Sequence, residues 1–509
     1  MEGALEPVDP NATPVVEYGW RRIIIVAAIM MAALLETLDS TIVNVALPTI
    51  EGNIGASLDQ GIWIITGYII SNVVSIPLNP LLIRLLGRAR YFTICIAGFT
   101  LASVLCSTAD SLTALVLFRV LQGAFGGGLI ATSQGVMRDT FPPSAIGASS
   151  ALFAIALILG PAMGPLFGGY LTDNLSWQWI FYVNVVPGTI AAVVMGTMLR
   201  DPVRAQRTPI DWYGVGLLAL GLGALQYLLD NGERLDWLDD TSIVVAGIVS
   251  LLALATFAWW QWSGTPRPVV DLHVFRFRSV SIGSIIAFAF GALIFVPAIV
   301  TPLYTSSLLG YTAYDSGVLL VMRALPVVIL TPVFATMAQG GADVRYMLGA
   351  GFGLSAASLW WLYGAMTTDT SFAQLAWPLL FSGIGQSMLL VPLIVGVLTT
   401  TPAALNGKIS PIITLSVQLG GSIASAACIA FFDRRTSFHA TILSGTSTAH
   451  HLAALGLQPT AAAIGQLAAA VNAQANTLGF ADTILAISAI AAIIVPIVLA
   501  FPRSQKAAS

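Results

Sequence analysis

The amino-acid sequence is most deficient in charge. Only 9% of the 509 residues are Asp, Glu, Lys or Arg, whereas a soluble domain is about one quarter charged. A surface with so few charges could not stay in water, so the composition excludes an ordinary soluble protein. Hydrophobic residues make up 57% of the chain, and the mean hydropathy is +0.86. We therefore expect a polytopic membrane protein.

Other absences exclude further classes of function. The net charge is -3 and no block of Lys or Arg occurs, so no nucleic-acid partner is expected. The three cysteines lie in apolar runs without the spacing of metal ligands, and we interpret them as core residues. No Walker-type loop is found, so ATP is not the expected energy source. No reactive cluster suggests an enzyme, and the first 22 residues lack the pattern of a signal peptide.

The hydrophobic residues form long runs, and a membrane-spanning helix needs about 20 apolar residues. We predict fourteen spans, and this even number places both termini on the same side. The predicted spans are 23–47, 62–82, 91–109, 112–137, 146–171, 179–198, 211–229, 243–262, 280–303, 314–338, 345–364, 374–399, 409–431 and 481–501.

The basic residues indicate which side the termini occupy. Sixteen of the 21 Lys and Arg residues fall on the side of the termini, and only Arg234, Arg434 and Arg435 fall in loops on the other side. Because short cytoplasmic loops are rich in Lys and Arg, we predict cytoplasmic tails at 1–22 and 502–509. The remaining two basic residues, Arg119 and Arg323, lie inside spans.

Two segments are predicted to lie outside the membrane on the far side. Residues 229–242 form a short acidic loop, and residues 433–480 form a long loop. The stretch 459–478 is rich in Ala and Gln, and it could form an amphipathic helix outside the bilayer. The long loop is either a simple surface excursion or a docking site for a partner.

Two acids interrupt the first span, "LLETLDSTIVNVALP" at 34–48. Glu36 and Asp39 are three residues apart, so they lie about 60° apart on one helix face. Charged side chains at membrane depth are expensive and usually functional. Burial favours the protonated form of a carboxylate, while a nearby arginine favours the anion. Asp39 could therefore couple transport to protons, and Glu36 is a candidate contact for a cationic substrate.

The buried arginines need partners of their own. Arg119 lies in the fourth span, and Gln122 follows it one turn later. Arg119 keeps its charge and needs an acid or a polar cavity, so a static ion pair that fixes helix packing is the structural alternative to a role in transport. Arg323 either pairs structurally, for example with Glu36, or selects ligands that carry an anionic group. Gln122 and Arg323 join Glu36 as candidate substrate-binding residues.

The fifth span contains "LGPAMGPLFGGY" at 159–170. Its glycines recur every four residues on one face, a spacing that lets two helices approach closely, and each of its prolines removes a backbone hydrogen bond and bends a helix. This combination suits a moving interface, although tight static packing would require the same glycines. The residues concerned are Gly160, Pro161, Gly164, Pro165, Gly168 and Gly169.

Four motifs occur in a specific order: "LDSTIVNVALP" (38–48), "FRVLQG" (118–123), the segment 159–188, and "PVVDLHVFRFRS" (268–279). Together they resemble the 14-span drug:proton antiporters of the major facilitator superfamily, in particular the EmrB/QacA-type branch and its EmrB-type members. The stretch 211–232 resembles the first extra central span of that branch. The resemblance runs from about residue 20 to 502.

The resemblance implies an all-α membrane fold of fourteen transmembrane helices. Two six-helix bundles would comprise residues 23–198 and 280–501, the second one including the loop 433–480. Two extra central helices would lie within 211–262. It also implies proton transfer by Asp39 and Arg119, a bacterial inner-membrane location, and no cofactor or metal besides the coupling proton.

The resemblance further implies a proton-coupled exporter that moves hydrophobic or cationic drugs by alternating access. Its expected partners are these small substrates and the lipid bilayer, and relatives often work with a periplasmic adaptor protein and an outer-membrane channel. Alternatives are an exporter of one natural metabolite or antibiotic, a proton-coupled importer, or a membrane scaffold of an envelope complex that transports nothing.

One loop departs from the family pattern. The superfamily usually has Gly-x-Leu-x-Asp-Arg-x-Gly-Arg between spans two and three, and the chain has "PLLIRLLGR" at 80–88. Gly87 and Arg88 fit the pattern, whereas Arg84 stands where the acid is usual. We therefore expect an altered cytoplasmic gate.

Overall fold

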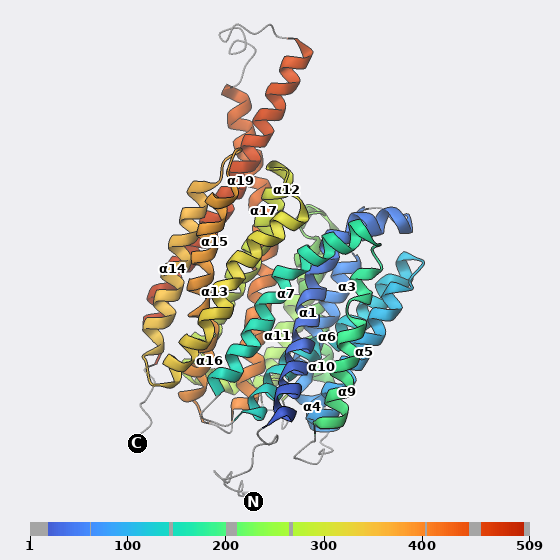
Figure 1. The fold of residues 1–509 in the computed structure, drawn as a ribbon, viewed down its shortest axis with the longest axis vertical. Coiled ribbons are helices and arrows are strands. Elements are labelled where there is room, and N and C mark those ends of the chain that lie inside the picture. Colours follow the sequence, from blue (N-terminus) through green and yellow to red (C-terminus); the bar gives the residue numbers. More distant parts are fainter. Residues whose placement is uncertain are drawn as a thin grey trace, which may run out of the picture.

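The chain folds as an all-helical bundle in a computed structural model (Figure 1). The structure describes residues 19–56, 58–61, 63–141, 146–199, 211–263, 268–402, 405–446 and 460–502. Every regular element within these residues is a helix. Twelve helices are long and apolar enough to cross a membrane. Two more, α7 (Ile146–Asn174) and α14 (Val344–Ala365), have 29 and 22 residues and pack among them. The predicted fold class is confirmed.

The helices form two groups joined by a central pair. The first group is α1 (Trp20–Ile54), α3 (Trp63–Ser75), η1 (Ile76–Leu78), α4 (Asn79–Leu86), α5 (Arg88–Ser107), α6 (Leu112–Thr140), α7, α8 (Trp179–Tyr182) and α9 (Val185–Met198). The central pair is α10 (Trp212–Asn231) and α11 (Thr241–Trp262). The second group is α12 (Arg278–Leu308), α13 (Ala313–Gln339), α14, α15 (Phe372–Ser387), α16 (Leu390–Thr399), α17 (Asn406–Thr446) and α19 (Ala461–Leu499).

The two groups repeat one packing pattern. In the first, α1 packs on α7, α3 on α6, and α5 on α9. In the second, α12 packs on α17, α13 on α15, and α14 on α19. The groups meet mainly where α7 lies along α13, at the centre of Figure 1.

Three predicted spans are interrupted. The second span is divided by the 3-10 turn η1, where Pro77 and Pro80 each lack the N–H of a regular helix. The sixth span breaks between α8 and α9, at Asn184. The twelfth span breaks between α15 and α16, after Ser387. Span length and hydropathy carry no information on these breaks, so the sequence analysis missed them.

The central helices are attached by polar contacts at one end. Asp211 caps α10 by accepting a hydrogen bond from the Gly214 N–H (2.9 Å), and it also accepts from the side chains of Trp260 and Gln261 in α11. Asp271 lies in the linker that follows α11, and it accepts a hydrogen bond from the side chain of Lys408 in α17 at 2.9 Å. Partial burial opposes ionisation of Asp271, but the charge and hydrogen bond of Lys408 together with the hydrogen bonds from His273 lower the pKa of Asp271. The linker is thereby tied to the second group.

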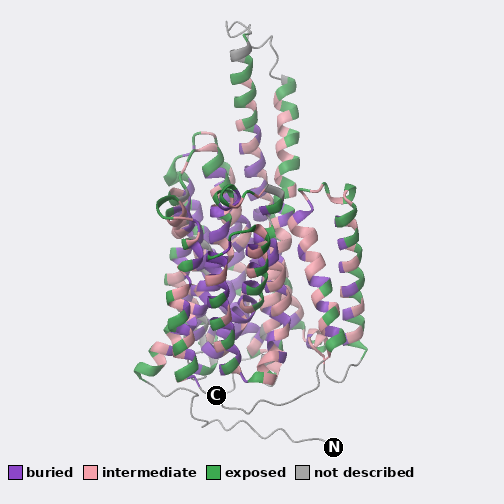
Figure 2. Ribbon diagram, turned by 90° about the vertical axis from the view of Figure 1, so that its right-hand side faces the viewer, coloured by how far each residue is buried: buried purple, intermediate pink, exposed green. Residues whose placement is uncertain are grey.

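The segment 433–480, predicted as a long loop, is largely helical. Helix α17 continues to Thr446 and α19 begins at Ala461, so the expected helix at 459–478 is the first half of α19. Residues 447–459 lie outside the described part of the chain. Figures 1 and 2 show α17 and α19 projecting together beyond all other helices. We call this projection, residues 433–446 and 461–480, the hairpin.

The hairpin projects from the end of the bundle opposite the termini. Helix α1 begins and α19 ends at the same end of the bundle (Figure 1). Burial is concentrated within the bundle, and the hairpin is mostly exposed along its length (Figure 2).

Candidate functional site

The apolar core of the first bundle divides where α1 carries its two acids. Leu35 belongs to one buried cluster and Leu38 to another. Glu36 and Asp39 lie at this junction and are only 3% and 0% exposed. Hydrophobic packing on both sides therefore isolates a small polar layer from water.

Asp39 is the centre of this polar layer. Its Oδ2 accepts a hydrogen bond from Nη1 of Arg119 at 2.5 Å. Its Oδ1 accepts from Nε2 of Gln122 at 2.9 Å and from Nδ2 of Asn184 at 2.8 Å. Both carboxylate oxygens are therefore satisfied by donors, and α1 is linked to α6 and to the break before α9.

Arg119 is held on several sides. Its Nε donates to the Ile64 carbonyl at 3.1 Å, and Nη1 also donates to Oε1 of Gln122 at 2.7 Å. The guanidinium lies over the ring of Tyr68, 4.0 Å from its centroid. The side chain is only 1% exposed. An arginine can be buried so completely because an acid, a carbonyl and an aromatic face replace its water.

Two members of this network were not predicted as site residues. Asn184 and Ser103, which accepts from Nε2 of Gln122 at 2.8 Å, are not among the candidates drawn from the sequence. Both are fully buried. The available signal was a polar residue within an apolar span, but only the break at Asn184 reveals why its amide can reach Asp39.

Glu36 lies beside this network without belonging to it. Its Oε1 accepts a hydrogen bond from Nδ2 of Asn72 at 2.8 Å. Within the described residues it forms no ion pair, whereas Asp39 pairs with Arg119. Tyr68 lies on α3 one turn before Asn72, the partner of Glu36. Its ring packs against Arg119, the partner of Asp39.

Arg323 lies in the second bundle, on α13. Its Nη2 donates to the carbonyls of Leu293 and Ile294 at 2.7 and 2.9 Å, and to Oε1 of Gln386 at 3.3 Å. Pro297 cannot donate to the carbonyl four residues earlier, so it leaves Leu293 free to accept. Arg323 is 6% exposed. Its partners in the described residues are these neutral groups, and the suggested pairing with Glu36 is not observed.

The glycines of α7 bring it close to α1. A β-carbon at Gly160 would overlap the side chain of Thr37, and one at Gly164 would overlap Thr41. One at Gly168 would lie 2.8 Å from the Ile42 carbonyl. The adjacent Gly169 is buried as well. Pro161 and Pro165 lie within the bounds of α7, and their side chains are outside the described part of the structure.

The departing loop motif forms the turn between α4 and α5. Gly87 has a φ of 85°, a conformation that favours glycine. Arg88 begins α5 and forms an ion pair with Asp139 near the end of α6. Arg84 lies in the last turn of α4. The motif residues Gly87 and Arg88 thus connect the second, third and fourth spans at the end of the bundle that holds the termini.

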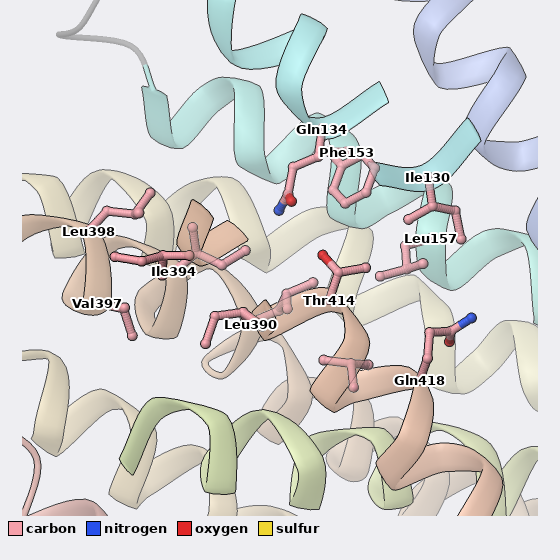
Figure 3. Close-up of a pocket in the computed structure, with 13 residues that line it drawn as sticks. Ile130, Gln134, Phe153, Leu157, Leu390, Ile394, Val397, Leu398, Thr414 and Gln418 are labelled. Atoms are coloured by element: carbon pink, nitrogen blue, oxygen red, sulfur yellow. The ribbon is translucent and has the colours of Figure 1, made fainter. Parts of the chain in front are cut away.

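A narrow pocket separates the two bundles near that same end (Figure 3). Gln134 of α6 and Thr414 of α17 lie on opposite sides of it, and Gln418 is its other polar lining residue. The remaining lining residues are apolar: Ile130, Phe153, Leu157, Leu390, Ile394, Val397, Leu398, Ile409, Ile413 and Val417. The space open to the centre of a water molecule is only about 30 Å³, whereas pockets for drug-sized ligands have volumes of about 300–1,000 Å³. The bundles are therefore nearly closed on each other here.

Comparison with known proteins identifies relatives over most of the chain. A family model described as Major Facilitator Superfamily matches residues 29–425. The fatty acid resistance protein FarB of Neisseria gonorrhoeae is 36% identical over 410 residues, which cover 79% of this chain and 76% of that protein. The multidrug export protein EmrB of Escherichia coli is 33% identical over 427 residues, covering 83% of this chain and 82% of that one.

A further relative and a solved structure extend this picture. The colistin resistance protein EmrB of Acinetobacter baumannii is 30% identical over 433 residues, or 83% of each chain. The crystal structure of the human organic anion transporter MFSD10 matches with a TM-score of 0.58 at 14% identity, covering 92% of this chain and 99% of that one. The latter likeness concerns the fold alone. The chain belongs to the major facilitator superfamily, and its similarity to EmrB-type export proteins confirms the resemblance seen in its motifs.

Proposed function

We propose that this protein exports hydrophobic or amphipathic compounds across a membrane in exchange for protons. The observation that carries this proposal is the fully buried Asp39–Arg119 pair, held by Gln122 and Asn184 between three spans of one bundle. A static scaffold would gain little from such a pair, because apolar residues of similar volume stabilise a core at least as well.

The pair could couple protons to motion as follows. A proton on Asp39 removes the charge that holds Arg119, so the contact between α1 and α6 weakens. Arg119 would then depend on the Ile64 carbonyl and the Gln122 amide. Loss of the proton restores the ion pair. Each charge that crosses the membrane supplies about 2.3 kcal/mol per 100 mV, and the pH difference adds to this energy.

The relatives' names support export as the direction and a broad range of substrates. Multidrug export, fatty acid resistance and colistin resistance are named for different relatives. The pocket between the bundles is lined by apolar side chains with two glutamines and a threonine, which suits an apolar portion of a substrate. Export of one particular amphipathic compound is the second candidate, and the fatty-acid relative favours it.

We place the protein in a bacterial inner membrane with both termini in the cytoplasm. The distribution of basic residues supports this orientation, and the hairpin then projects away from the cytoplasm. The export proposal requires no cofactor besides the proton.

Transport in everted membrane vesicles tests the proposal. The vesicles are given a pH gradient with an acidic interior. Addition of a transported substrate should drive protons out of the vesicles, and a pH-sensitive dye inside them should report the rise in internal pH. A panel of hydrophobic dyes, quaternary ammonium compounds and long-chain carboxylates should include compounds that do this. Uptake that persists after the gradient is collapsed with a protonophore would exclude proton coupling.

We further propose that the hairpin contacts a periplasmic adaptor protein. Phe438 and Ile442, four residues apart on α17, and Ile464 on α19 are 50%, 49% and 49% exposed. Large apolar side chains exposed outside the bilayer favour a protein partner. This surface is positioned to contact such a partner because it projects beyond every other described helix (Figure 2).

Replacement of Phe438, Ile442 and Ile464 by serine should separate two activities. Drug resistance of whole cells should fall, because export across two membranes needs the adaptor, while efflux in everted vesicles should not change. Leu238→Ser is the matched control, since Leu238 is 83% exposed in the α10–α11 loop, and it should leave both activities intact. Equal resistance of the triple variant and the unaltered protein would refute the adaptor contact.

A further inference from the structure

We propose that Arg323 binds the anionic headgroup of an amphipathic substrate whose apolar tail enters the pocket between the bundles. This inference rests on the proposed export function and specifies its substrate class as amphipathic organic anions, such as long-chain carboxylates. It starts from a charge imbalance. The first bundle neutralises its buried Arg119 with Asp39, and the second bundle gives Arg323 no acid within the described residues.

Burial without an acid is unusual for a guanidinium. Arg323 is 6% exposed, and its hydrogen-bond acceptors are two carbonyls and one amide oxygen. Neutral acceptors compensate only part of the energy that an arginine loses when it leaves water. A substrate that brings a negative charge to this position would complete the compensation.

A purely structural role explains the hydrogen bonds but not the charge. The Leu293 carbonyl, freed by Pro297, already lies 3.4 Å from the donor Nε2 of Gln386. An uncharged donor at position 323 could serve the same carbonyl without the burial of a cation. The full charge therefore suggests a ligand.

The guanidinium has one unused buried donor for that ligand. All of the hydrogen bonds to the Leu293, Ile294 and Gln386 oxygens use Nη2. The Nε atom of Arg323 is buried and has no hydrogen-bond partner. Nη2, the other donor on the Nε edge, is already occupied, so Nε–H can give a carboxylate oxygen one charge-assisted hydrogen bond.

The tail site lies close to this headgroup site. Gln386, which contacts Arg323, is four residues before Leu390, which lines the pocket. The break between α15 and α16 lies between these two residues. No lining residue of the pocket is charged. The pocket is nearly closed in this structure, so the alkyl chain of a carboxylate bound at Arg323 would occupy its apolar lining only after the two bundles separate.

Dodecanoate and ethidium provide an anionic and a cationic probe for transport by purified protein in proteoliposomes. Arg323→Gln, which retains an amide donor but removes the charge, should raise the KM for dodecanoate at least tenfold and leave ethidium transport within twofold of the unaltered protein. Arg323→Lys should be intermediate, because it keeps the charge but lacks the Nε donor of the guanidinium. Arg345 already pairs with Asp343, so the control Arg345→Gln should change the transport of neither probe.

A binding measurement separates this inference from the proposed function. Dodecanoate should raise the thermal unfolding temperature of the unaltered protein but not of Arg323→Gln, and methyl dodecanoate should raise neither. If Arg323→Gln does not fold, Pro297→Ala/Arg323→Gln replaces it, since an alanine N–H can serve the Leu293 carbonyl. Equal loss of dodecanoate and ethidium transport, or unchanged dodecanoate binding, would overturn the inference. Dodecanoate binding without proton-driven transport of either probe would overturn only the proposed function.

Discussion

Asp39→Asn is expected to abolish proton-driven efflux while the protein still reaches the membrane. Oδ1 of Asp39 accepts from Gln122 and Asn184, and Oδ2 accepts from Arg119. An asparagine amide has only one acceptor oxygen, so its NH₂ group must face a donor whichever way it is turned. The variant also cannot release a proton. The measurement is dye efflux from everted vesicles, driven by an imposed pH gradient.

Loss of stability alone could mimic this result, because an unpaired buried charge costs about 3–5 kcal/mol. The double variant Asp39→Asn/Arg119→Gln is the control, since it removes both charges. It should recover most of the unfolding temperature lost in the single variant and remain inactive in gradient-driven efflux. Gradient-driven efflux by either variant would show that Asp39 does not carry the coupling proton.

Glu36→Gln is an informative comparison because Glu36 lies one turn from Asp39 but outside the Arg119 network. The hydrogen bond from the Asn72 amide can be accepted equally by a glutamine oxygen. The variant should retain gradient-driven efflux of uncharged dyes. A loss of coupling in Glu36→Gln together with coupling in Asp39→Asn would assign the proton to Glu36.

The sequence predicted the membrane fold and the identity of the buried charges, because both depend on composition. Apolar runs mark spans, and Asp39, Arg119 and Gln122 were conspicuous as polar residues within them. The structure brings these three side chains together. It does not bring Glu36 and Arg323 together, because Arg323 contacts α12 and Gln386 of the second bundle. Opposite charge alone does not identify which helices are neighbours.

Features that depend on local backbone geometry could not be read from the sequence. The Leu293 carbonyl becomes an acceptor for Arg323 only because Pro297 stands one turn later and α13 packs beside it. Asn184 reaches Asp39 from the break before α9. A helix at 459–478 was expected from the sequence, but the extension of α17 to Thr446 was not, because low hydropathy reports membrane insertion and not helix formation.

Gly160→Ala is expected to impair transport strongly by separating α1 from α7. The added β-carbon would overlap Thr37 and lie 2.8 Å from the Leu38 backbone nitrogen. Thr37 cannot easily turn away, because its hydroxyl donates to the Ala33 carbonyl at 3.0 Å and the Ala156 carbonyl at 3.3 Å. Overpacking of this kind costs about 1–3 kcal/mol, and it displaces the segment of α1 that carries Asp39. Gradient-driven efflux and thermal unfolding should be measured together.

Gly353→Ala is the matched control, because a β-carbon at Gly353 of α14 meets no atom within 4 Å, and alanine favours a helix by about 1 kcal/mol. It should leave transport intact. If Gly160→Ala loses efflux while its unfolding temperature is close to normal, the α1–α7 contact must change during transport. A matching loss of both would instead indicate static packing. The distinction is important because α7 also packs along α13, where Leu166 meets Gly317. A contact that moves on the α1 side would thus transmit the state of Asp39 directly to the other bundle.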